Sequence, residues 1–178
     1  MKKLSVLLYF LFATFIQGQW FQQHSDIYQY YNALYFMDSS NGYVGGYSYP
    51  GNPFILRTTD GGETWNQNSI NSNPHSINFT NSTTGFCAAY NGIYKTTDSG
   101  DSWIMIYQDD SHFTSVQFIN ENSGWAVGSE SSGNLNLIRT QNGGATWNKT
   151  LVASGVTDPK IEIINQSTGF IISEGSCQ

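Results

Sequence analysis

The chain has 178 residues, of which only 11% are charged and 15% are aromatic, and its formal net charge is -6. An acidic chain with few basic residues is repelled by phosphate backbones, which argues against nucleic acid as a partner. Glycine, asparagine, serine and threonine are abundant and no long run of helix formers occurs. This balance favours short strands joined by tight turns.

The N-terminus has the three parts of a secretory signal peptide. A basic pair, Lys2 and Lys3, precedes an apolar run from Leu4 to Ile16, and small and polar residues follow. The run is shorter than the roughly 20 residues that a membrane-spanning helix needs. We therefore expect residues 1–18 to be a signal peptide cleaved after Gly18. Residues 19–178 are then one mature domain without a membrane span, which is secreted or lies at the cell surface or in the periplasm.

The next predicted element is a β-hairpin that recurs four times along the chain. Aligning the glycines of the four copies places an apolar residue six positions before each glycine and an aromatic residue directly after it. Alternating apolar residues before the glycine are typical of a strand with one buried face, and the Asn, Ser and Gly residues between mark the turn. The four glycines are Gly42, Gly85, Gly124 and Gly169, and the apolar residues are Phe36, Phe79, Phe118 and Ile163.

Three of the hairpins are followed by the same nine-residue segment, here called the box. Its copies are RTTDGGETW from Arg57, KTTDSGDSW from Lys95 and RTQNGGATW from Arg139. A third strand leads into each box and a fourth leaves it, so one repeat is four antiparallel strands, the size of a propeller blade. The shared positions are Thr58, Asp60, Gly62, Thr64 and Trp65 in the first copy, Thr96, Asp98, Gly100, Ser102 and Trp103 in the second, and Thr140, Asn142, Gly144, Thr146 and Trp147 in the third.

We expect these box residues to be structural. A carboxylate at the Asp position can accept hydrogen bonds from backbone N–H groups of its own turn, and Asn142 can do the same. The box glycines can adopt the positive φ that a tight turn demands. The three tryptophans are expected to pack between neighbouring blades. Cys87 is expected to be a small buried strand residue, and a bridge to Cys177 remains open.

Both ends of the chain predict an incomplete ring. Trp20 precedes Phe36 by 16 residues, as Trp147 precedes Ile163, so Trp20 is expected to mark an outer strand without a box. The last hairpin stops before a third strand. We predict an all-β β-propeller of four-stranded antiparallel blades, with about three whole blades and a split, incomplete one. The main interpretation is a fragment of a longer propeller, and an imperfectly closed four-bladed ring is the alternative. Open blade edges favour self-association.

The boxes resemble the BNR or Asp-box repeats of sialidases, sortilin-type receptors and xyloglucan-degrading glycosidases. The segment GWAVG after Ser123, together with LIRTQNGGATW, is most similar to the photosystem II stability/assembly factor-like propellers, which include secreted bacterial proteins. The resemblance covers about Trp20 to Ser173. It implies a seven-bladed ring, of which this chain is about half.

The residues favour a non-catalytic binding scaffold over an enzyme. A sialidase needs an arginine cluster for its substrate carboxylate, whereas the mature chain has only Arg57 and Arg139, both at the same repeat position. A glycoside hydrolase of the xyloglucanase type needs two suitably spaced carboxylates and is the alternative. The histidines lack metal-ligand spacing, so no metal or cofactor is predicted. Carboxylates outside boxes, hairpin turns and strands are Asp26, Asp109, Asp110, Glu130, Asp158 and Glu174.

The loops between the second and third strands lie on the face opposite the boxes, where binding residues are expected. Exposed tyrosines there can stack on a sugar or bind a peptide. Among the carboxylates outside boxes, hairpin turns and strands, Asp109 and Asp110 form the only local cluster, and His112 lies in the same run. We predict that the ligand is a protein or glycan surface, and that the binding residues are these three with Tyr47, Tyr49 and Tyr90.

Overall fold

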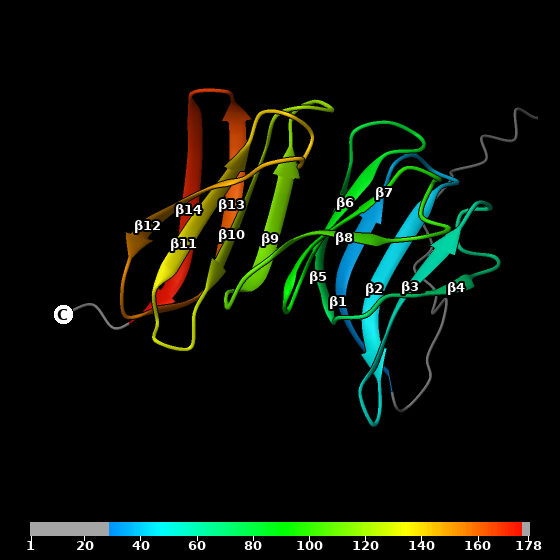
Figure 1. The fold of residues 1–178 in the computed structure, drawn as a ribbon. Coiled ribbons are helices and arrows are strands. Elements are labelled where there is room, and N and C mark those ends of the chain that lie inside the picture. The colour runs from blue at the N-terminus through cyan, green and yellow to red at the C-terminus, as the bar shows by residue number, and fades with distance from the viewer. Residues whose placement is uncertain (1–28, 176–178) are drawn as a thin grey trace, which may run out of the picture.

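The computed structural model describes residues 29–175, which form fourteen strands and no helix (Figure 1). Across this described part of the chain, no helix is therefore long and apolar enough to cross a membrane. The predicted signal peptide, the outer strand expected at Trp20 and the possible bridge partner Cys177 lie outside the described residues.

The strands form three four-stranded antiparallel sheets and one two-stranded sheet, each with its strands in sequence order. The prediction of three whole blades and an incomplete one is confirmed. Blade 1 contains β1 (Gln29–Phe36), β2 (Gly42–Ser48), β3 (Asn52–Thr58) and β4 (Asn66–Ser69). Blade 2 contains β5 (Pro74–Phe79), β6 (Gly85–Ala89), β7 (Gly92–Thr96) and β8 (Ile104–Gln108). Blade 3 contains β9 (His112–Phe118), β10 (Gly124–Ser129), β11 (Leu135–Thr140) and β12 (Asn148–Ala153), and blade 4 contains β13 (Val156–Asn165) and β14 (Thr168–Gly175).

The blades lie side by side in chain order. The first strands, β1, β5, β9 and β13, are the inner strands, since each contacts the first strand of the next blade. The fourth strands are the outer ones. Figure 1 shows blade 1 and blade 4 at opposite ends of this open array.

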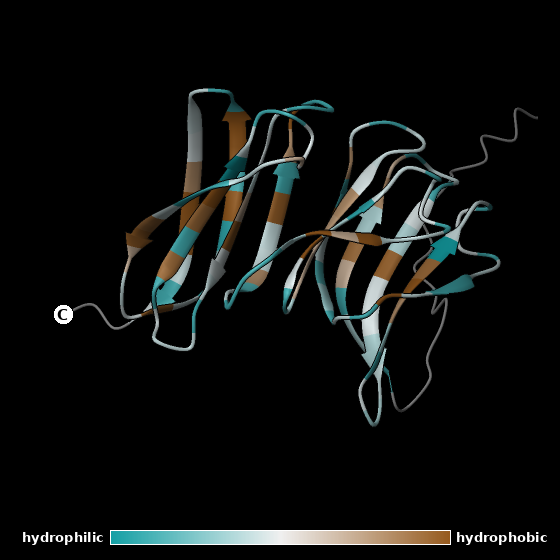
Figure 2. Cartoon of the chain, in the orientation of Figure 1, coloured by the Kyte–Doolittle hydropathy of each residue, from teal (hydrophilic) through white to brown (hydrophobic). Residues whose placement is uncertain are grey.

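Three hydrophobic clusters join the blades, each built by two neighbouring sheets. Figure 2 shows hydrophobic residues, in brown, along strands of all four blades. Successive residues of a strand point to opposite faces of its sheet, so a blade with consecutive apolar residues can contribute to a cluster on each face. Between blades 1 and 2, Tyr43 stacks on Phe79 at 4.3 Å between ring centroids, and the fully buried Cys87 belongs to the same cluster. Between blades 2 and 3, Phe86 stacks on Phe118 at 3.5 Å.

The third cluster places Trp125 against Ile161 and Ile163, between blades 3 and 4. In all three clusters, the aromatic residue after the hairpin glycine packs toward the next blade, where it meets the apolar residue six positions before that blade's own glycine. The shared pattern of the hairpins is therefore a pattern of contacts between blades.

The first box is held by hydrogen bonds within its own turn. The Thr58 hydroxyl donates to the Asp60 carboxylate at 2.7 Å and accepts the N–H of Gly62 at 2.8 Å. The N–H and hydroxyl of Thr64 donate to the same carboxylate at 2.9 and 2.6 Å. These bonds, with the Thr64 hydroxyl as the largest cause, lower the pKa of Asp60 to about 2.

The second and third boxes repeat this geometry. Ser102 donates from its N–H to Asp98 at 2.9 Å, and Thr146 donates from its N–H to the Asn142 side-chain oxygen at 2.9 Å. The box glycines Gly62, Gly100 and Gly144 have φ values of 97°, 85° and 87°. The expected local role of the Asp position, of Asn142 and of these glycines agrees with this geometry.

The expectation for the box tryptophans is correct for two of the three. Trp103 joins the cluster between blades 1 and 2 and meets Phe79 edge-on, and Trp147 joins the cluster between blades 2 and 3. Trp65 differs, because no described blade precedes its own. It meets Phe36 of blade 1 edge-on at 6.3 Å between ring centroids and remains half-buried.

Candidate functional site

A groove with a cavity volume of about 860 Å³ lies among the loops of blades 2, 3 and 4. It is bounded by the β6–β7 turn, the β8–β9 loop, the β10–β11 turn and the start of β13. Antiparallel strands place these connections at the ends of the sheets opposite the boxes. The groove therefore lies on the face where binding residues are expected. Its lining includes Tyr90, Asn91, Gln108, Asp109, Asp110, His112, Ser129, Glu130, Gly133 and Asp158.

The structure brings four of the six predicted binding residues into this groove and leaves two outside it. Tyr90 lies in the β6–β7 turn, Asp109 and Asp110 lie in the β8–β9 loop, and His112 begins β9. Tyr47 and Tyr49 belong to blade 1 and do not line it. Tyr47 is half-buried and its ring stacks on Tyr30 at 4.9 Å between centroids, while Tyr49 is exposed in the β2–β3 turn.

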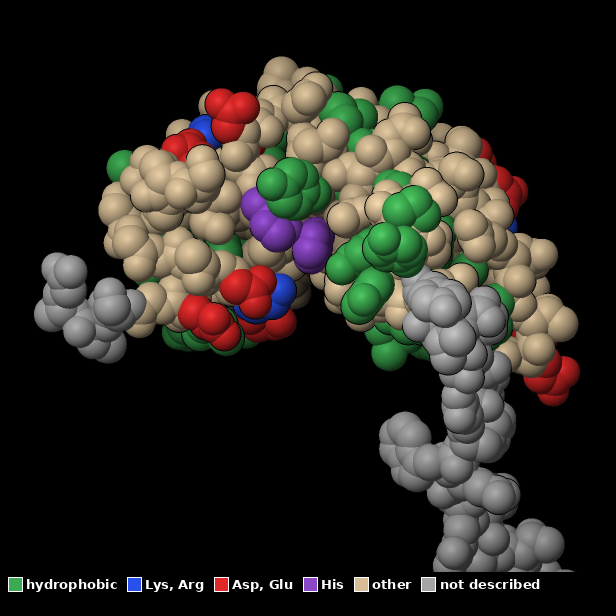
Figure 3. Space-filling model, turned by 90° about the horizontal axis from the view of Figure 1, so that it is seen from below, with side chains coloured by type: hydrophobic (Ala, Val, Ile, Leu, Met, Phe, Trp, Pro, Cys, Tyr) green, Lys and Arg blue, Asp and Glu red, His purple; other side chains and the backbone are tan. Residues whose placement is uncertain are grey.

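Two histidines from neighbouring blades meet beside the groove, and one of them, His112, belongs to its lining. Nε2 of His112, at the start of β9, lies 2.8 Å from Nε2 of His75 in β5. The exposed Tyr90 ring lies 4.7 Å from the His112 ring, between centroids. Figure 3 shows the two histidines side by side on the surface, in purple. This pair was not predicted from the sequence, because the two residues are 37 positions apart and only the packing of adjacent inner strands brings them together.

The surroundings of this pair disfavour the charged imidazolium form. The pKa of His75 is lowered to about 4, with burial as the largest cause and the charges of His112 and Lys160 as smaller ones. Burial also lowers the pKa of His112. Near neutral pH both rings are therefore neutral, and one Nε2–H can donate to the other Nε2. No cluster of three metal-ligating side chains occurs within residues 29–175.

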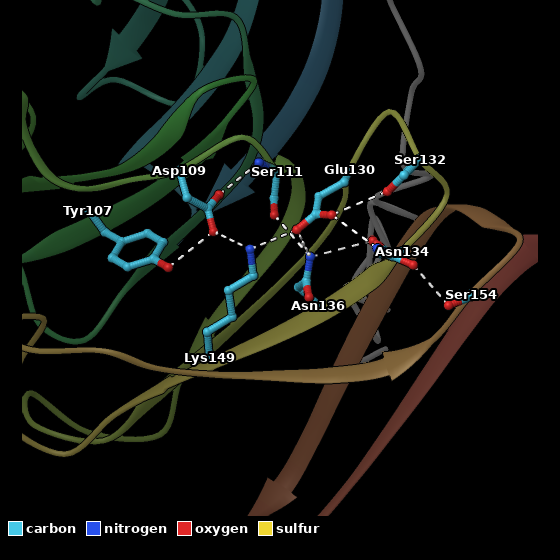
Figure 4. A network of polar contacts seen from close by, with 9 residues as sticks. All are labelled: Tyr107, Asp109, Ser111, Glu130, Ser132, Asn134, Asn136, Lys149 and Ser154. Carbon is cyan, nitrogen blue, oxygen red and sulfur yellow. Dashed lines mark hydrogen bonds and ion pairs between the residues drawn. The ribbon is translucent and has the colours of Figure 1, made fainter.

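A lysine holds two carboxylates of the groove together (Figure 4). Nζ of Lys149 in β12 lies 2.9 Å from Asp109 and 2.9 Å from Glu130. Although burial lowers the pKa of Lys149, its hydrogen bonds with Glu130 and Asp109 outweigh this effect and raise the pKa overall. The hydrogen bond from Lys149 is the largest cause that lowers the pKa of Glu130 to about 2.

Further hydrogen bonds fix the positions of both carboxylates. Asp109 accepts the N–H of Ser111 at 2.7 Å and the hydroxyl of Tyr107 at 3.1 Å. Glu130 accepts the side-chain amide of Asn136 at 2.9 Å. Burial, followed by the charge of Asp109, raises the pKa of Tyr107 to about 12, so its phenol remains a donor. The wall of the groove is thus preorganised by contacts between blades 2 and 3.

The groove carries an excess of negative charge. Four carboxylates line it, whereas the two nearby lysines, Lys149 and Lys160, are each bound to carboxylates; Lys160 lies 3.0 Å from Asp158. The groove side chains with full charges at neutral pH are Asp109, Asp110, Glu130 and Asp158. From the sequence, Glu130 and Asp158 are both expected in loops, whereas the structure places Asp158 near the start of β13, and their convergence depends on how adjacent blades pack. Nothing in the sequence identified Lys149 as part of a site, because it is one lysine in a predicted strand.

A second cavity, of about 560 Å³, lies between blades 3 and 4 and has Arg139 and Trp125 in its lining. The basic residue at the start of each other box contacts the next box: Arg57 binds Asp101 at 2.6 Å, and Lys95 donates to the Gly143 carbonyl at 2.9 Å. Blade 4 has no box within the described residues, and Arg139 instead lies over the Trp125 ring at 5.2 Å. The repeated basic position is therefore a contact between blades.

Comparison with solved structures shows similarity to two kinds of propeller. The GH74 enzyme of Niastella koreensis matches 75% of this chain with a TM-score of 0.62 and 19% identity. YCF48 from Cyanidioschyzon merolae matches 82% with a TM-score of 0.60 and 17% identity, and YCF48 bound to D1 peptide matches 74% with a TM-score of 0.55 and 21% identity. Neither the family models nor the curated proteins compared with this chain gave a significant match.

The matched region is a part of each of these structures. This chain covers 24% of the GH74 enzyme and 48% and 43% of the two YCF48 chains, which is less than half in every case. At such identities the similarity establishes the fold. The protein is a β-propeller of the kind seen in GH74 enzymes and YCF48, with three complete blades and part of a fourth in the described chain.

Proposed function

We propose that this protein is a non-catalytic binding propeller whose groove takes up a basic segment of another protein. The main observation that supports this proposal is the exposed Tyr90 ring beside His112, with four carboxylates in the same groove. A tyrosine offers a large rigid contact surface at low entropic cost, and carboxylates attract lysine and arginine side chains. The structure of YCF48 bound to D1 peptide supports a protein ligand for a propeller of this fold.

The ion pairs of the groove carboxylates also favour binding over catalysis. A glycosidase needs one carboxylic acid that donates a proton to the leaving group. Lys149 holds Glu130 ionised, with a pKa lowered to about 2, and the same ammonium contacts Asp109. The four carboxylates outnumber the two lysines that contact them, and the remaining negative charge attracts cations. A fragment of a glycoside hydrolase is the second candidate, since a GH74 enzyme is among the structural neighbours.

The experiment is a binding screen with matched variants. The mature chain is applied to an array of lysine- and arginine-containing peptides and, separately, to neutral β-glucan and xyloglucan oligosaccharides. The tightest peptide is then titrated by calorimetry against the wild type, Tyr90→Ala and Asp110→Asn. Both residues are exposed, so the variants should remain folded. We expect roughly tenfold weaker binding for Tyr90→Ala, the usual size for a central aromatic contact.

The control is Glu63→Gln, which removes an exposed charge in the first box, on the opposite face. Its affinity should equal that of the wild type. Binding of oligosaccharides alone, with release of reducing sugar, would favour the hydrolase candidate and refute the protein ligand. Equal peptide affinity for wild type and Tyr90→Ala would remove the groove as the site.

We also propose that the protein acts outside the cytoplasm. The proposal rests on the basic pair, the apolar run and the small residues that precede Gln19. Mass spectrometry of the protein recovered from its host tests it. A mature N-terminus at Gln19 in the extracytoplasmic fraction is expected, and an intact Met1 in the cytoplasm would contradict it.

A further inference from the structure

Blade 1 exposes the face that every later blade buries against the blade before it, here called the front face. Leu34 of blade 1 is 71% exposed, whereas its repeat equivalents Ile77 and Val116 are 6% and 4% exposed. Phe36 is likewise exposed, although its equivalents in blades 2 to 4 are buried. The half-buried Trp65 extends the same face. Blade 1 thus presents an apolar surface with the composition of an interior contact.

Blade 4 exposes the complementary surface, here called the back face, which blades 1 to 3 bury against the following blade. Phe170 is 63% exposed and Ile172 is 71% exposed. Their repeat equivalents in blade 3, Trp125 and Val127, are buried in the cluster with Ile161 and Ile163 of blade 4. The two uncovered faces are therefore the two halves of one contact that already occurs three times within the chain.

We propose that a second copy of this chain covers these faces head to tail, with the back face of blade 4 packed on the front face of blade 1 of the other copy. The internal contacts specify the arrangement. Tyr43 stacks on Phe79 and Phe86 stacks on Phe118. By the same register, Phe170 of one copy packs on Phe36 of the next.

The first box has a place in this arrangement. The second box closes over the back face of blade 1, because the Tyr43 hydroxyl donates to the Ser99 carbonyl and a Cβ at Gly100 would lie 2.8 Å from the Tyr43 ring. Ile106 of blade 2 approaches Gly144 of the third box in the same way. The box of blade 1, at Gly62, then closes over Phe170 of the neighbouring copy. A head-to-tail contact of this kind is heterologous, because each copy contributes a different surface.

Two single variants test the proposal, each placing a charge on one face at a highly exposed position: Leu34→Asp on the front face and Ile172→Asp on the back face. Molar mass is measured by light scattering from about 1 to 100 µM, because association depends on concentration. The control is Leu151→Asp, an equally apolar and exposed position on the outer strand β12. Circular dichroism and melting curves confirm that each variant is folded.

The wild type and Leu151→Asp should have the mass of two or more copies. The molar mass of each interface variant alone should be at most half of that value. In such a sample every copy carries the same damaged face, so every head-to-tail contact would include one. Mixing Leu34→Asp with Ile172→Asp should restore a two-copy species, because each variant retains the face that the other lacks. This restoration is specific to head-to-tail packing.

A wild type that stays monomeric over the whole range would overturn the proposal, and would mean that other parts of a chain or another partner cover these faces. Association that persists in either single variant would also overturn it. A contact between two front faces, or between two back faces, would give this result, because one of the two variants leaves the contacting face intact. The groove faces the loop side of the blades, so peptide binding by the groove can be measured independently of the outcome.

Discussion

The hydroxyl of Tyr43 in blade 1 donates a hydrogen bond to the carbonyl of Ser99 in the box of blade 2, over 2.8 Å. This bond joins a strand to the box of the next blade, and the Tyr43 ring that carries the hydroxyl also stacks on Phe79. The equivalents of Tyr43 in blades 2 and 3 are Phe86 and Trp125, which have no hydroxyl. The junction of blades 1 and 2 therefore combines apolar packing with part-buried polar contacts, which also include the bond from the Asn68 amide to the Gly100 carbonyl at 2.7 Å.

Removal of that hydroxyl should have a small effect, and removal of a packed ring a large one. Tyr43→Phe is expected to lower the free energy of unfolding by about 0.5 to 1.5 kcal/mol, the usual value for one hydrogen bond. Trp103→Ala at the same junction should lower it by roughly 3 to 5 kcal/mol. Urea unfolding followed by tryptophan fluorescence and circular dichroism measures both. A Trp103→Ala variant that melts within a degree or two of the wild type would refute the role of the box tryptophan between blades.

The box predicts a difference between two substitutions at one position. Asp60→Asn preserves an oxygen that can accept the N–H of Thr64, as Asn142 does for Thr146. Asp60→Ala removes that acceptor and leaves the turn donors without it. We expect Asp60→Ala to lower the melting temperature by about 2 to 4 °C, and Asp60→Asn to lower it by less than half as much. Equal losses for the two variants would mean that charge, and not the local hydrogen bonds, holds the box.

The histidine pair predicts a pH dependence of stability. The pKa of His75 is about 4 in the folded chain and near 6.5 when unfolded, so the unfolded state binds more protons between these values. Stability should fall as the pH is lowered from 6.5 to 4. Losses from Glu130, Asp60 and Asp98, whose pKa values are lowered to about 2, set in as the pH falls through the ordinary values of 4.5 for Glu130 and 3.8 for the two aspartates. Melting curves of the wild type and His75→Gln are compared over the upper window.

The substitution His75→Gln removes the titrating group and retains a polar side chain beside His112. The variant should show a flatter dependence of melting temperature on pH between 6.5 and 4, and the same dependence below 3.8. Identical slopes in the upper window would show that His75 is not the group that titrates there.

Lys149 predicts a coupling between the carboxylates that it joins. Lys149→Met leaves Asp109 and Glu130 without their shared cation, and the variant should be less stable than the wild type at pH 7. Adding Glu130→Gln should restore part of the lost stability, because only one of the two carboxylates is then left charged without Lys149. A double-mutant cycle from urea unfolding measures this coupling. Additive losses would indicate that the two side chains do not interact in solution.

The two tyrosines outside the groove provide a separate prediction. If Tyr47 and Tyr49 contribute to a binding face, the double variant Tyr47→Ala, Tyr49→Ala should weaken glycan or peptide binding. Tyr47 stacks on Tyr30, so its removal is also expected to loosen the end of β2. Tyr49→Ala alone separates these effects, because Tyr49 is exposed in the turn. Unchanged binding in the double variant would confine the site to the groove.

The repeats determine how much of this structure can be predicted from sequence. Glycine register, apolar alternation and the box were sufficient for the strands and for the incomplete last blade, because those features act within one repeat. The face that holds Tyr90 and Asp110 follows from the alternating strand direction. The pairing of His75 with His112, and the contact of Lys149 with Asp109, could not be predicted. Both depend on the offset between adjacent sheets, which no local pattern specifies.

The most direct measurement on the proposed site is hydrogen exchange of the mature chain with and without the tightest-binding array peptide. Slower exchange is expected at the β6–β7 turn around Asn91, at the β8–β9 loop around Asp110 and at the β10–β11 turn around Ser131. The boxes should exchange at the same rate in both samples. Protection of the boxes, or of the front face of blade 1, with unchanged exchange in these three loops would contradict a binding groove on the loop face.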